Sequence, residues 1–159
     1  MAFRVLDSSA FYAGIPFGSN EPSYTTSLFY NEIEHIKKDH DAIQILIETK
    51  RLMIRDPEHK FIITANDAAK KSGDFPNLSE QDISTIALSL QLEAELVTDD
   101  FAISNVAKNL SVKVVPIMTS GIKNIIIWKY YCPGCKTNFS KVSECPRCGN
   151  RLKRKPIKN

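Results

Sequence analysis

The chain has no run of apolar residues that approaches the about 18 needed to cross a bilayer. Residues 3–17 are interrupted by Arg4 and Asp7, so they do not resemble a signal peptide. Cysteine is absent from residues 1–131, whereas a secreted disulfide protein would spread its bridges through the chain. These absences predict a soluble, cytoplasmic protein.

A Gly-rich phosphate loop is also absent, which argues against a nucleotide-dependent enzyme. The histidines are few, at His35, His40 and His59, and lie in polar stretches where we expect them to be solvated. A phosphatase of the haloacid dehalogenase type needs a second aspartate two residues after the first, but Ser9 follows Asp7 at that spacing. Carboxylates and cysteines are therefore left as the carriers of chemistry.

The charge of the chain is divided unevenly along its 159 residues. Residues 1–128 hold 12 Lys and Arg against 17 Asp and Glu, a net charge of −5. Residues 129–159 hold 9 basic residues and one acid, Glu144, a net charge of +8. The chain is 43% hydrophobic, which excludes general disorder and leaves room for one domain and a small module. An acidic body followed by a basic segment predicts two units with different tasks.

Strands and helices are expected to alternate along the acidic part. Strands are predicted at residues 3–6, 53–54, 95–98 and 112–117, and helices at 8–13, 25–36, 41–52, 61–71, 79–92 and 101–110. Ser79 and Asp82 have the spacing of a capping box at the start of one helix. Residues 14–24 are predicted to be a loop, 122–128 a strand or a connecting strand, and 151–159 a disordered tail. The alternation predicts an α/β fold with a parallel sheet and helices on both faces.

The four cysteines follow the pattern C-x2-C-x9-C-x2-C, at Cys132, Cys135, Cys145 and Cys148. Each C-x2-C pair can turn two sulfurs toward one ion, and four thiolates complete a closed, structural Zn²⁺ site. Gly149 supplies a flexible backbone after the last ligand. Rubredoxin-like iron and a pair of redox dithiols or disulfides are the alternatives.

The basic charge around the cysteines favours a ribbon that binds a polyanion over an electron carrier. The candidate RNA-binding residues are Lys129, Lys136, Lys141, Arg147, Arg151, Lys153, Arg154 and Lys155. Tyr130, Tyr131 and Phe139 either stack on unpaired bases or form the small core of the ribbon, and the core is the preferred interpretation for Phe139.

Acidic residues stand at corresponding places in the predicted elements: Asp7 ends the first strand, and Asp99 and Asp100 follow the strand at 95–98. Each is also a good helix cap, and Asp82 can complete its capping box. Because the carboxyl ends of parallel strands build the site of such a sheet, we expect these carboxylates to meet there. A divalent cation would relieve their repulsion, and oxygen ligands suit Mg²⁺ or Mn²⁺. Such a cluster can activate water for attack on a phosphodiester.

The order V-L-D-S-S-A-F (5–11), N-E-I (31–33), L-S-E-Q-D-I-S-T-I-A-L (78–88) and L-V-T-D-D-F (96–101) resembles the PIN-domain nucleases. With S-N-V-A (104–107) and the four-cysteine ribbon, about residues 2–150 resemble the archaeal Nob-one family. The resemblance implies a three-layer α/β/α nuclease domain and a zinc ribbon. It divides the chain into a nuclease domain (1–120), a connecting strand or linker (121–129), the ribbon (130–152) and a basic tail (153–159). It also implies an endoribonuclease that trims the 3′ end of small-subunit (16S) ribosomal RNA during ribosome assembly.

By position, Asp7, Glu32, Asp82 and Asp100 match the acidic set of the family, which holds Mg²⁺ or Mn²⁺. Asp99 is a candidate to share the role of Asp100, and Glu34, about 200° around the helix from Glu32, is expected to face away. Thr98 and Ser8 are candidate supporting hydroxyls. The expected partners are precursor ribosomal RNA, the small subunit and a further assembly factor. A non-catalytic assembly factor and a toxin-type PIN ribonuclease are the alternatives, although toxin-type proteins lack the ribbon.

Overall fold

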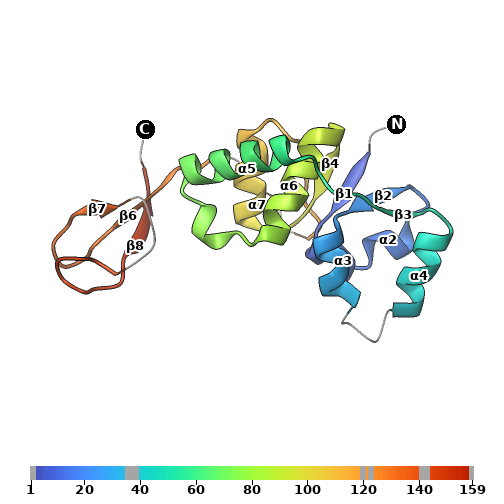
Figure 1. Ribbon diagram of the computed structural model, residues 1–159, viewed down its shortest axis with the longest axis horizontal. Helices are drawn as coiled ribbons and strands as arrows, with labels where there is room; N and C mark the ends of the chain where they lie inside the picture. Colours follow the sequence, from blue (N-terminus) through green and yellow to red (C-terminus); the bar gives the residue numbers. More distant parts are fainter. Residues whose placement is uncertain (1–2, 35–39, 119–120, 122–123, 140–143, 158–159) are drawn as a thin grey trace.

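The computed structural model describes residues 3–34, 40–118, 121, 124–139 and 144–157. Its main sheet has five parallel strands in the order β3-β2-β1-β4-β5 (Figure 1). The strands are β1 (Arg4–Leu6), β2 (Ser23–Thr25), β3 (Leu52–Ile54), β4 (Glu95–Val97) and β5 (Val114–Val115). No helix in the described part of the chain is long and apolar enough to span a membrane.

Helices cover both faces of this sheet. They are α1 (Ser8–Tyr12), α2 (Ile15–Gly18), α3 (Ser27–Glu34), α4 (His40–Glu48), α5 (His59–Ser72), η1 (Phe75–Asn77), α6 (Glu80–Leu92) and α7 (Phe101–Asn109). Val5 and Leu96 pack into one core with α5, α6 and α7. The next residue on each strand, Leu6 or Val97, packs into a second core with α1, α3 and α4. Alternate strand residues point to opposite faces, so the expected three-layer arrangement is confirmed.

The segment predicted as a loop, residues 14–24, instead contains α2 and β2. Pro16 stands in the first turn of α2, where its missing N–H costs nothing. The Arg51 guanidinium donates to the carbonyls of Pro16 (3.3 Å) and Phe17 (3.5 Å). The prediction was wrong because this short helix depends on a partner more than 30 residues away, which Gly and Pro punctuation does not reveal.

The basic segment forms a separate three-stranded antiparallel sheet in the order β7-β6-β8. Its strands are β6 (Trp128–Tyr131), β7 (Asn138–Phe139) and β8 (Lys153–Pro156). The prediction of a disordered tail was wrong, because β8 pairs with β6 along its whole length and Leu152 is buried before it. Of the strand or connecting strand predicted at 122–128, residues 122–123 lie outside the described residues, residues 124–127 have no regular secondary structure, and only Trp128 belongs to a strand, β6. The boundaries of the four segments remain a prediction.

The ribbon touches the nuclease domain at the C-terminal end of α5 (Figure 1). Gly73 caps α5 with a left-handed φ of 82°, and its carbonyl accepts a hydrogen bond from the Tyr130 hydroxyl. A Cβ at Gly73 would lie 2.5 Å from the Trp128 carbonyl oxygen and 2.8 Å from the Trp128 Cβ. The two units therefore approach each other more closely than any residue except glycine allows.

We expect Gly73→Ala to loosen the ribbon from the nuclease domain. The added Cβ costs about 1 kcal/mol for the backbone conformation and also collides with Trp128. Trp128 is the single tryptophan of the chain, so its fluorescence emission should shift to the red as it gains solvent. Gly14→Ala is the matched control, because Gly14 has a φ of 76° but nothing within 4 Å of its would-be Cβ. Identical emission spectra for the two variants would contradict this account.

Candidate active site and zinc site

The strand order places the topological switch point between β1 and β4. After β1 the chain builds β2 and β3 on one side, and then crosses to β4 on the other side of β1. In open parallel sheets, the crevice at the carboxyl ends of such a strand pair is where ligands bind. Asp7 directly follows β1, and Thr98, Asp99 and Asp100 directly follow β4. The ends of β1 and β4 are in contact, because the Thr98 hydroxyl donates to Asp7 and the Asp99 amide donates to Ser9.

Asp7 is the buried centre of this edge, with a side chain only 2% exposed. Its carboxylate accepts hydrogen bonds from the Ser9 hydroxyl (2.6 Å), the Ala10 amide (3.2 Å) and the Thr98 hydroxyl. Burial raises the pKa of Asp7, the hydrogen bonds lower it, and the nearby Asp100 raises it further. None of the described groups that shift this pKa is cationic. Hydrogen-bond dipoles therefore orient the Asp7 carboxylate, and no cation among these described groups neutralises it.

Asp82 is the second carboxylate with a raised pKa. Burial is the main cause, hydrogen bonds with Ser79 lower the pKa, and the charge of Asp100 raises it. The predicted capping box is confirmed: the Asp82 carboxylate accepts from the Ser79 amide (2.8 Å), and the Ser79 hydroxyl accepts from the Asp82 amide (3.2 Å). Asp100 is exposed and is the electrostatic neighbour that Asp7 and Asp82 share.

Asp99 and Asp100 have different surroundings although they are adjacent. The Asp99 carboxylate accepts from the backbone amides of Ile117 and Met118, both at 2.8 Å, and so fixes the segment after β5. Asp100 caps α7 by accepting from the Ile103 amide at 2.9 Å, and its own amide donates to Thr98 Oγ1 at 3.0 Å. Thr98 thereby links Asp100 to Asp7.

Glu32 lies on α3 next to the buried Ile33 and is exposed. The side chain of Glu34 lies outside the described residues. Among the described residues, only the four cysteines offer three or more ligand atoms close enough to surround one ion. The carboxylates are therefore more widely spaced than a site in which every ligand touches the ion. A hydrated divalent cation such as Mg²⁺ keeps several of its waters and needs only one or two direct carboxylates, which this arrangement permits.

The sequence interpretation missed Ser9 and named Ser8 instead. Ser9 Oγ donates to Asp7 and accepts from the Asp99 amide at 3.3 Å, which ties the ends of β1 and β4 together. The available signal was the helix-capping geometry, because a residue two positions after an N-cap aspartate lies within reach of its carboxylate. Thr98, the other hydroxyl that the sequence singled out, donates to the Asp7 carboxylate.

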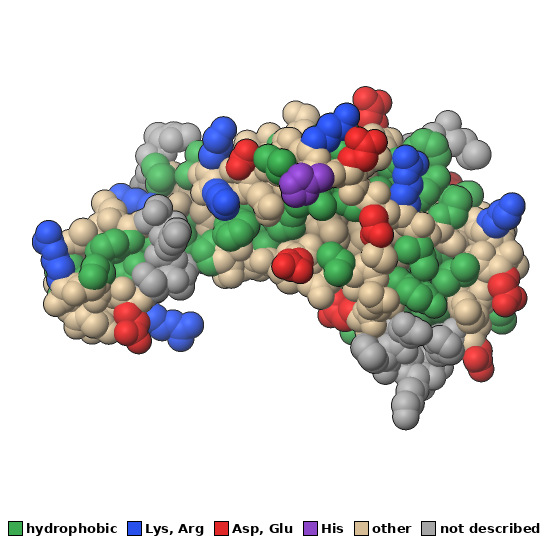
Figure 2. All heavy atoms as spheres, in the orientation of Figure 1, with side chains coloured by type: hydrophobic (Ala, Val, Ile, Leu, Met, Phe, Trp, Pro, Cys, Tyr) green, Lys and Arg blue, Asp and Glu red, His purple; other side chains and the backbone are tan. Residues whose placement is uncertain are grey.

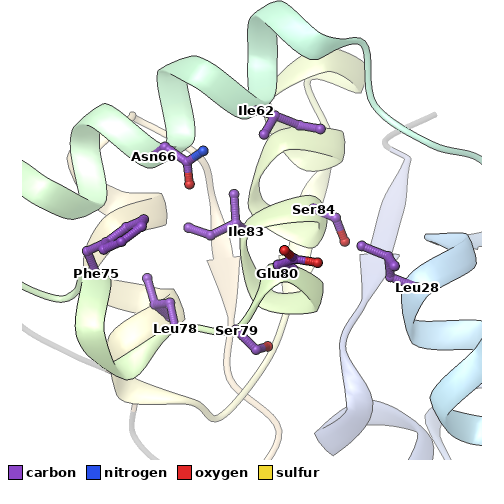
Figure 3. A pocket seen from close by; sticks show the side chains of 9 residues that line it. All are labelled: Leu28, Ile62, Asn66, Phe75, Leu78, Ser79, Glu80, Ile83 and Ser84. Carbon is purple, nitrogen blue, oxygen red and sulfur yellow. The ribbon is translucent and has the colours of Figure 1, made fainter.

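A groove of about 320 Å³ lies beside the first turn of α6 (Figure 3). Leu28, Ile62, Phe75 and Ile83 give it largely apolar walls, and the Asn66 side chain points into it. Asp82 is about 200° around α6 from Glu80, which lines the groove. Ser79, whose amide and hydroxyl are both hydrogen-bonded to Asp82, also lines the groove, so the groove begins beside the capping box that holds Asp82.

The four cysteine sulfurs all lie within 4.8 Å of one another, as the spacing predicted. Cys135 Sγ and Cys145 Sγ are 3.6 Å apart, too far for a disulfide of about 2.05 Å and close to the roughly 3.8 Å expected between thiolates bound tetrahedrally at about 2.3 Å from Zn²⁺. All four cysteines are free of disulfides. The set is therefore suited to a structural zinc ion.

The two cysteine turns are built alike. The Lys136 amide donates to the Cys132 carbonyl (2.9 Å), and the Gly149 amide donates to the Cys145 carbonyl (2.8 Å). Lys136 and Gly149, each just after the second cysteine of its pair, have left-handed φ values of 63° and 70°. Gly149 was expected to need this freedom, and Lys136 adopts the same conformation at the cost of some strain.

The thiols shift one another's pKa values in opposite directions. Hydrogen bonding with Thr137 lowers the pKa of Cys135 to about 6. The hydrogen bond between Cys148 and Cys135, followed by desolvation, raises the pKa of Cys148 to about 12. Four thiolates so close together require a cation to neutralise them.

The basic residues separate onto two faces of the ribbon sheet. Directly paired residues share a face, so Lys129, Tyr131, Lys153 and Lys155 lie on one side of β6 and β8. Trp128, Tyr130 and Arg154 lie on the other, where Tyr130 contacts Gly73. Lys136, Arg147 and Arg151 are exposed outside these strands, and Lys141 lies outside the described residues. Tyr130 is buried and Phe139 packs on it, so both belong to the ribbon core.

Comparison with known proteins identifies the matching family as "PIN domain of ribonuclease", over residues 5–92. The chain is 37% identical to "Endoribonuclease Nob1" of Methanocaldococcus jannaschii, over 100% of this chain and 80% of the relative. It is 32% identical to "Endoribonuclease Nob1" of Pyrococcus abyssi, over 94% and 91% respectively. It is also 36% identical to "Ribonuclease VapC1" of Thermoplasma acidophilum, over 77% of this chain and 63% of that protein.

Proposed function

The chain belongs to the PIN-domain ribonucleases and to the Nob1 endoribonucleases among them, and we propose that it cleaves precursor 16S ribosomal RNA at its 3′ end during ribosome maturation. It is a nuclease acting on RNA, and dependence on a divalent metal is typical of PIN domains. The observation that carries the proposal is Asp7: a buried carboxylate at the switch point, beside Asp100, without a cationic partner among the groups that shift its pKa.

We propose that Asp7, Glu32, Asp82 and Asp100 hold Mg²⁺ or Mn²⁺, directly or through water. A cation bound there would lower the pKa of a water molecule and neutralise charge on the phosphate. Ser9 and Thr98 orient the Asp7 carboxylate toward the crevice. Asp99 fits a supporting role better than a ligand role, because both of its oxygens accept backbone hydrogen bonds.

The substrate assignment is tested with a panel of RNAs. A 16S fragment with a 3′ extension, a tRNA and an unstructured mRNA of equal length are incubated with the full chain and Mn²⁺. Preferred cleavage of the 16S fragment, with 5′-phosphate and 3′-hydroxyl products, supports the proposal. Preferred cleavage of tRNA or mRNA would favour a toxin-type ribonuclease, the alternative that the similarity to Ribonuclease VapC1 supports. Binding without cleavage would favour a non-catalytic assembly factor.

The small ribosomal subunit in the cytoplasm is the proposed setting, and a further assembly factor is a proposed partner. The similarity to Nob1 endoribonucleases along most of the chain supports it. The outer face of the ribbon, formed by Lys129, Tyr131, Lys153 and Lys155, is the proposed RNA-binding surface. Lys155 Nζ lies 4.9 Å from the centre of the Tyr131 ring, which offers a cation and an aromatic face together.

We expect the Lys153→Gln, Lys155→Gln double variant to weaken RNA binding and flatten its salt dependence. Each phosphate contact contributes a slope of about −0.7 in log K against log salt for a single strand, so losing two should reduce the slope by about 1.4. Fluorescence anisotropy over a salt series measures this. Lys108→Gln, Lys113→Gln changes the charge equally but lies on α7 and before β5 in the nuclease domain. If both double variants have the same slope, the outer face does not contact the RNA backbone.

A further inference from the structure

Asn105 is a buried polar residue on α7 that clamps the segment leading into the ribbon. It is 0% exposed and lies among the apolar core residues of the helix. Its Nδ2 donates to the Ile126 carbonyl (2.6 Å), and its Oδ1 accepts from the Ile126 amide (2.7 Å). One side chain thus satisfies both backbone groups of a residue two positions before β6.

Asp74 supports this clamp from the end of α5. It is 0% exposed and accepts from Asn105 Nδ2 (2.6 Å) and from the Ser72 hydroxyl (2.7 Å). Burial raises the pKa of Asp74, while hydrogen bonds from Asn105 and Ser72 and the charge of Arg154 lower it. Arg154 is on β8, so its attraction to Asp74 acts between the ribbon and the nuclease domain. The Arg154 guanidinium also lies 4.3 Å from the centre of the Trp128 ring.

The inner face of β6 completes the junction. The Tyr130 hydroxyl donates to the Gly73 carbonyl, and the Trp128 ring meets Phe101 edge-on at 6.5 Å. The linker and β6 are therefore held by separate contacts to α7 and to the end of α5, and β8 is held through Arg154, which lies over Trp128 and is attracted to Asp74. A flexible tether would not need a buried carboxylate and a buried amide at its base, since burying them costs free energy that hydrogen bonds must offset. Both functional atoms of the Asn105 amide are hydrogen-bonded, and Asp74 accepts two hydrogen bonds at Oδ2 while its Oδ1 is buried without a partner.

We propose that Gly73, Asp74 and Asn105 hold the ribbon as a ruler that determines which phosphate is cut. The inference rests on the proposed function, in which the outer face of the ribbon binds the RNA. With the ribbon fixed, the path from Lys153 and Lys155 to the carboxylates has one length, and only one phosphate reaches Asp7. Figure 2 shows the hollowed underside that runs from the ribbon along the nuclease domain, with acidic side chains at its edge.

The clamp residues act through the ribbon and do not touch the RNA, so they are positioning residues. Each buried hydrogen bond shifts an equilibrium by about fivefold. Removing the Asn105 amide deletes three such bonds, and the ribbon then samples several orientations around the nuclease domain. Several phosphates reach the carboxylates in turn, so the cut positions spread while the total rate of cleavage changes little.

The experiment maps the cut ends of the 3′-extended 16S fragment for wild type, Asn105→Ala and Tyr130→Phe. Tyr130→Phe keeps the ring in the ribbon core and loses only the hydroxyl, which guards against misfolding of the first variant. Ser89→Ala is the matched control, because it removes a buried hydrogen bond to the Thr85 carbonyl inside α6. Nitrogen-15 relaxation of the same proteins reports whether ribbon and nuclease domain tumble as one body.

We expect one cut position for wild type and Ser89→Ala, and several neighbouring positions for the two clamp variants, Asn105→Ala and Tyr130→Phe. A clamp variant whose ribbon tumbles separately but which still cuts at the single wild-type position would overturn the ruler. So would separate tumbling in the wild type, whatever the RNA result. If the wild type tumbles as one body but does not cut the 16S fragment, the substrate assignment fails and the clamp stands.

Discussion

Asp7→Asn should abolish RNA cleavage while leaving the fold intact. Removing a partner that only orients a metal ligand typically costs about 10- to 100-fold in affinity or activity, so removing the charge of the central ligand should cost more than about 100-fold. The asparagine can keep the cap, because its Oδ1 still accepts from the Ala10 amide and the Ser9 hydroxyl. Its amide can donate to Thr98 Oγ1, since the hydroxyl proton is free to rotate. Cleavage is measured on the 3′-extended fragment with Mn²⁺.

Without metal, Asp7→Asn should be at least as stable as the wild type, and the direction of this change follows from the pKa of Asp7. Burial raises the pKa of Asp7 above its ordinary value of 3.8, so folding favours the protonated form. The stability that this group contributes is complete below pH 3.8 and is lost as pH rises through the raised pKa. At pH 7 in EDTA, Asp7→Asn should therefore melt at the wild-type temperature or above it, and Mn²⁺ should stabilise the wild type more than the variant.

Asp67→Asn is the control for both measurements, because Asp67 is an exposed carboxylate on α5 outside the acidic edge. It should cleave RNA and respond to Mn²⁺ like the wild type. If Asp7→Asn cleaves as fast as Asp67→Asn, Asp7 has no catalytic role, and the raised pKa reflects burial alone.

The acidic edge was predictable from the sequence because two general rules coincide there. A short apolar run that ends in aspartate marks a strand end, and parallel strands bring their ends to one edge, so Asp7 and Asp100 had to be near each other. The choice between Asp99 and Asp100 was not predictable, because the two differ in their long-range partners. The amides of Ile117 and Met118 that bind Asp99 follow β5, which lies inside the strand predicted at 112–117, but a strand pattern does not show which side chain the amides after it bind.

The clamp at the ribbon junction was invisible for a related reason. Asn105 interrupts the apolar face of α7, but one polar residue on a helix gives no indication of its partner, and Asp74 is 31 residues away. The lysines of β8 were misread because a charge run usually marks a solvated end. These basic residues form an ordered strand because they pack on aromatic residues of β6: Arg154 lies over Trp128, and Lys155 lies over Tyr131. Cross-strand pairing of this kind has no local signature.

Loss of the metal from the cysteine site should unfold the ribbon but not the nuclease domain. Among the described residues of the ribbon, four are buried in its core: Tyr130, Cys132, Cys145 and Leu152. Structural Zn²⁺ contributes about 10–16 kcal/mol to such modules, far more than so small a core can. Cys132→Ser should therefore bind little zinc and keep its helical circular dichroism. Its Trp128 emission should shift to the red, because Trp128 loses Arg154 and Phe101.

Loss of the zinc site should affect recruitment of the RNA and not the chemical step. A cysteine variant tests this better than a chelator, because a chelator would also remove the catalytic cation. With Mn²⁺ present, Cys132→Ser should keep its kcat on a short unstructured RNA, because the acidic edge lies in the nuclease domain. Its KM for the 16S fragment should rise steeply, because the basic outer face is no longer ordered. Thr137→Val is the control, since it removes a hydroxyl bonded to Cys135 Sγ but no ligand, and it should retain one zinc per chain by elemental analysis. Iron in the purified wild type, or an unchanged KM in Cys132→Ser, would refute the zinc ribbon as the part that recruits RNA.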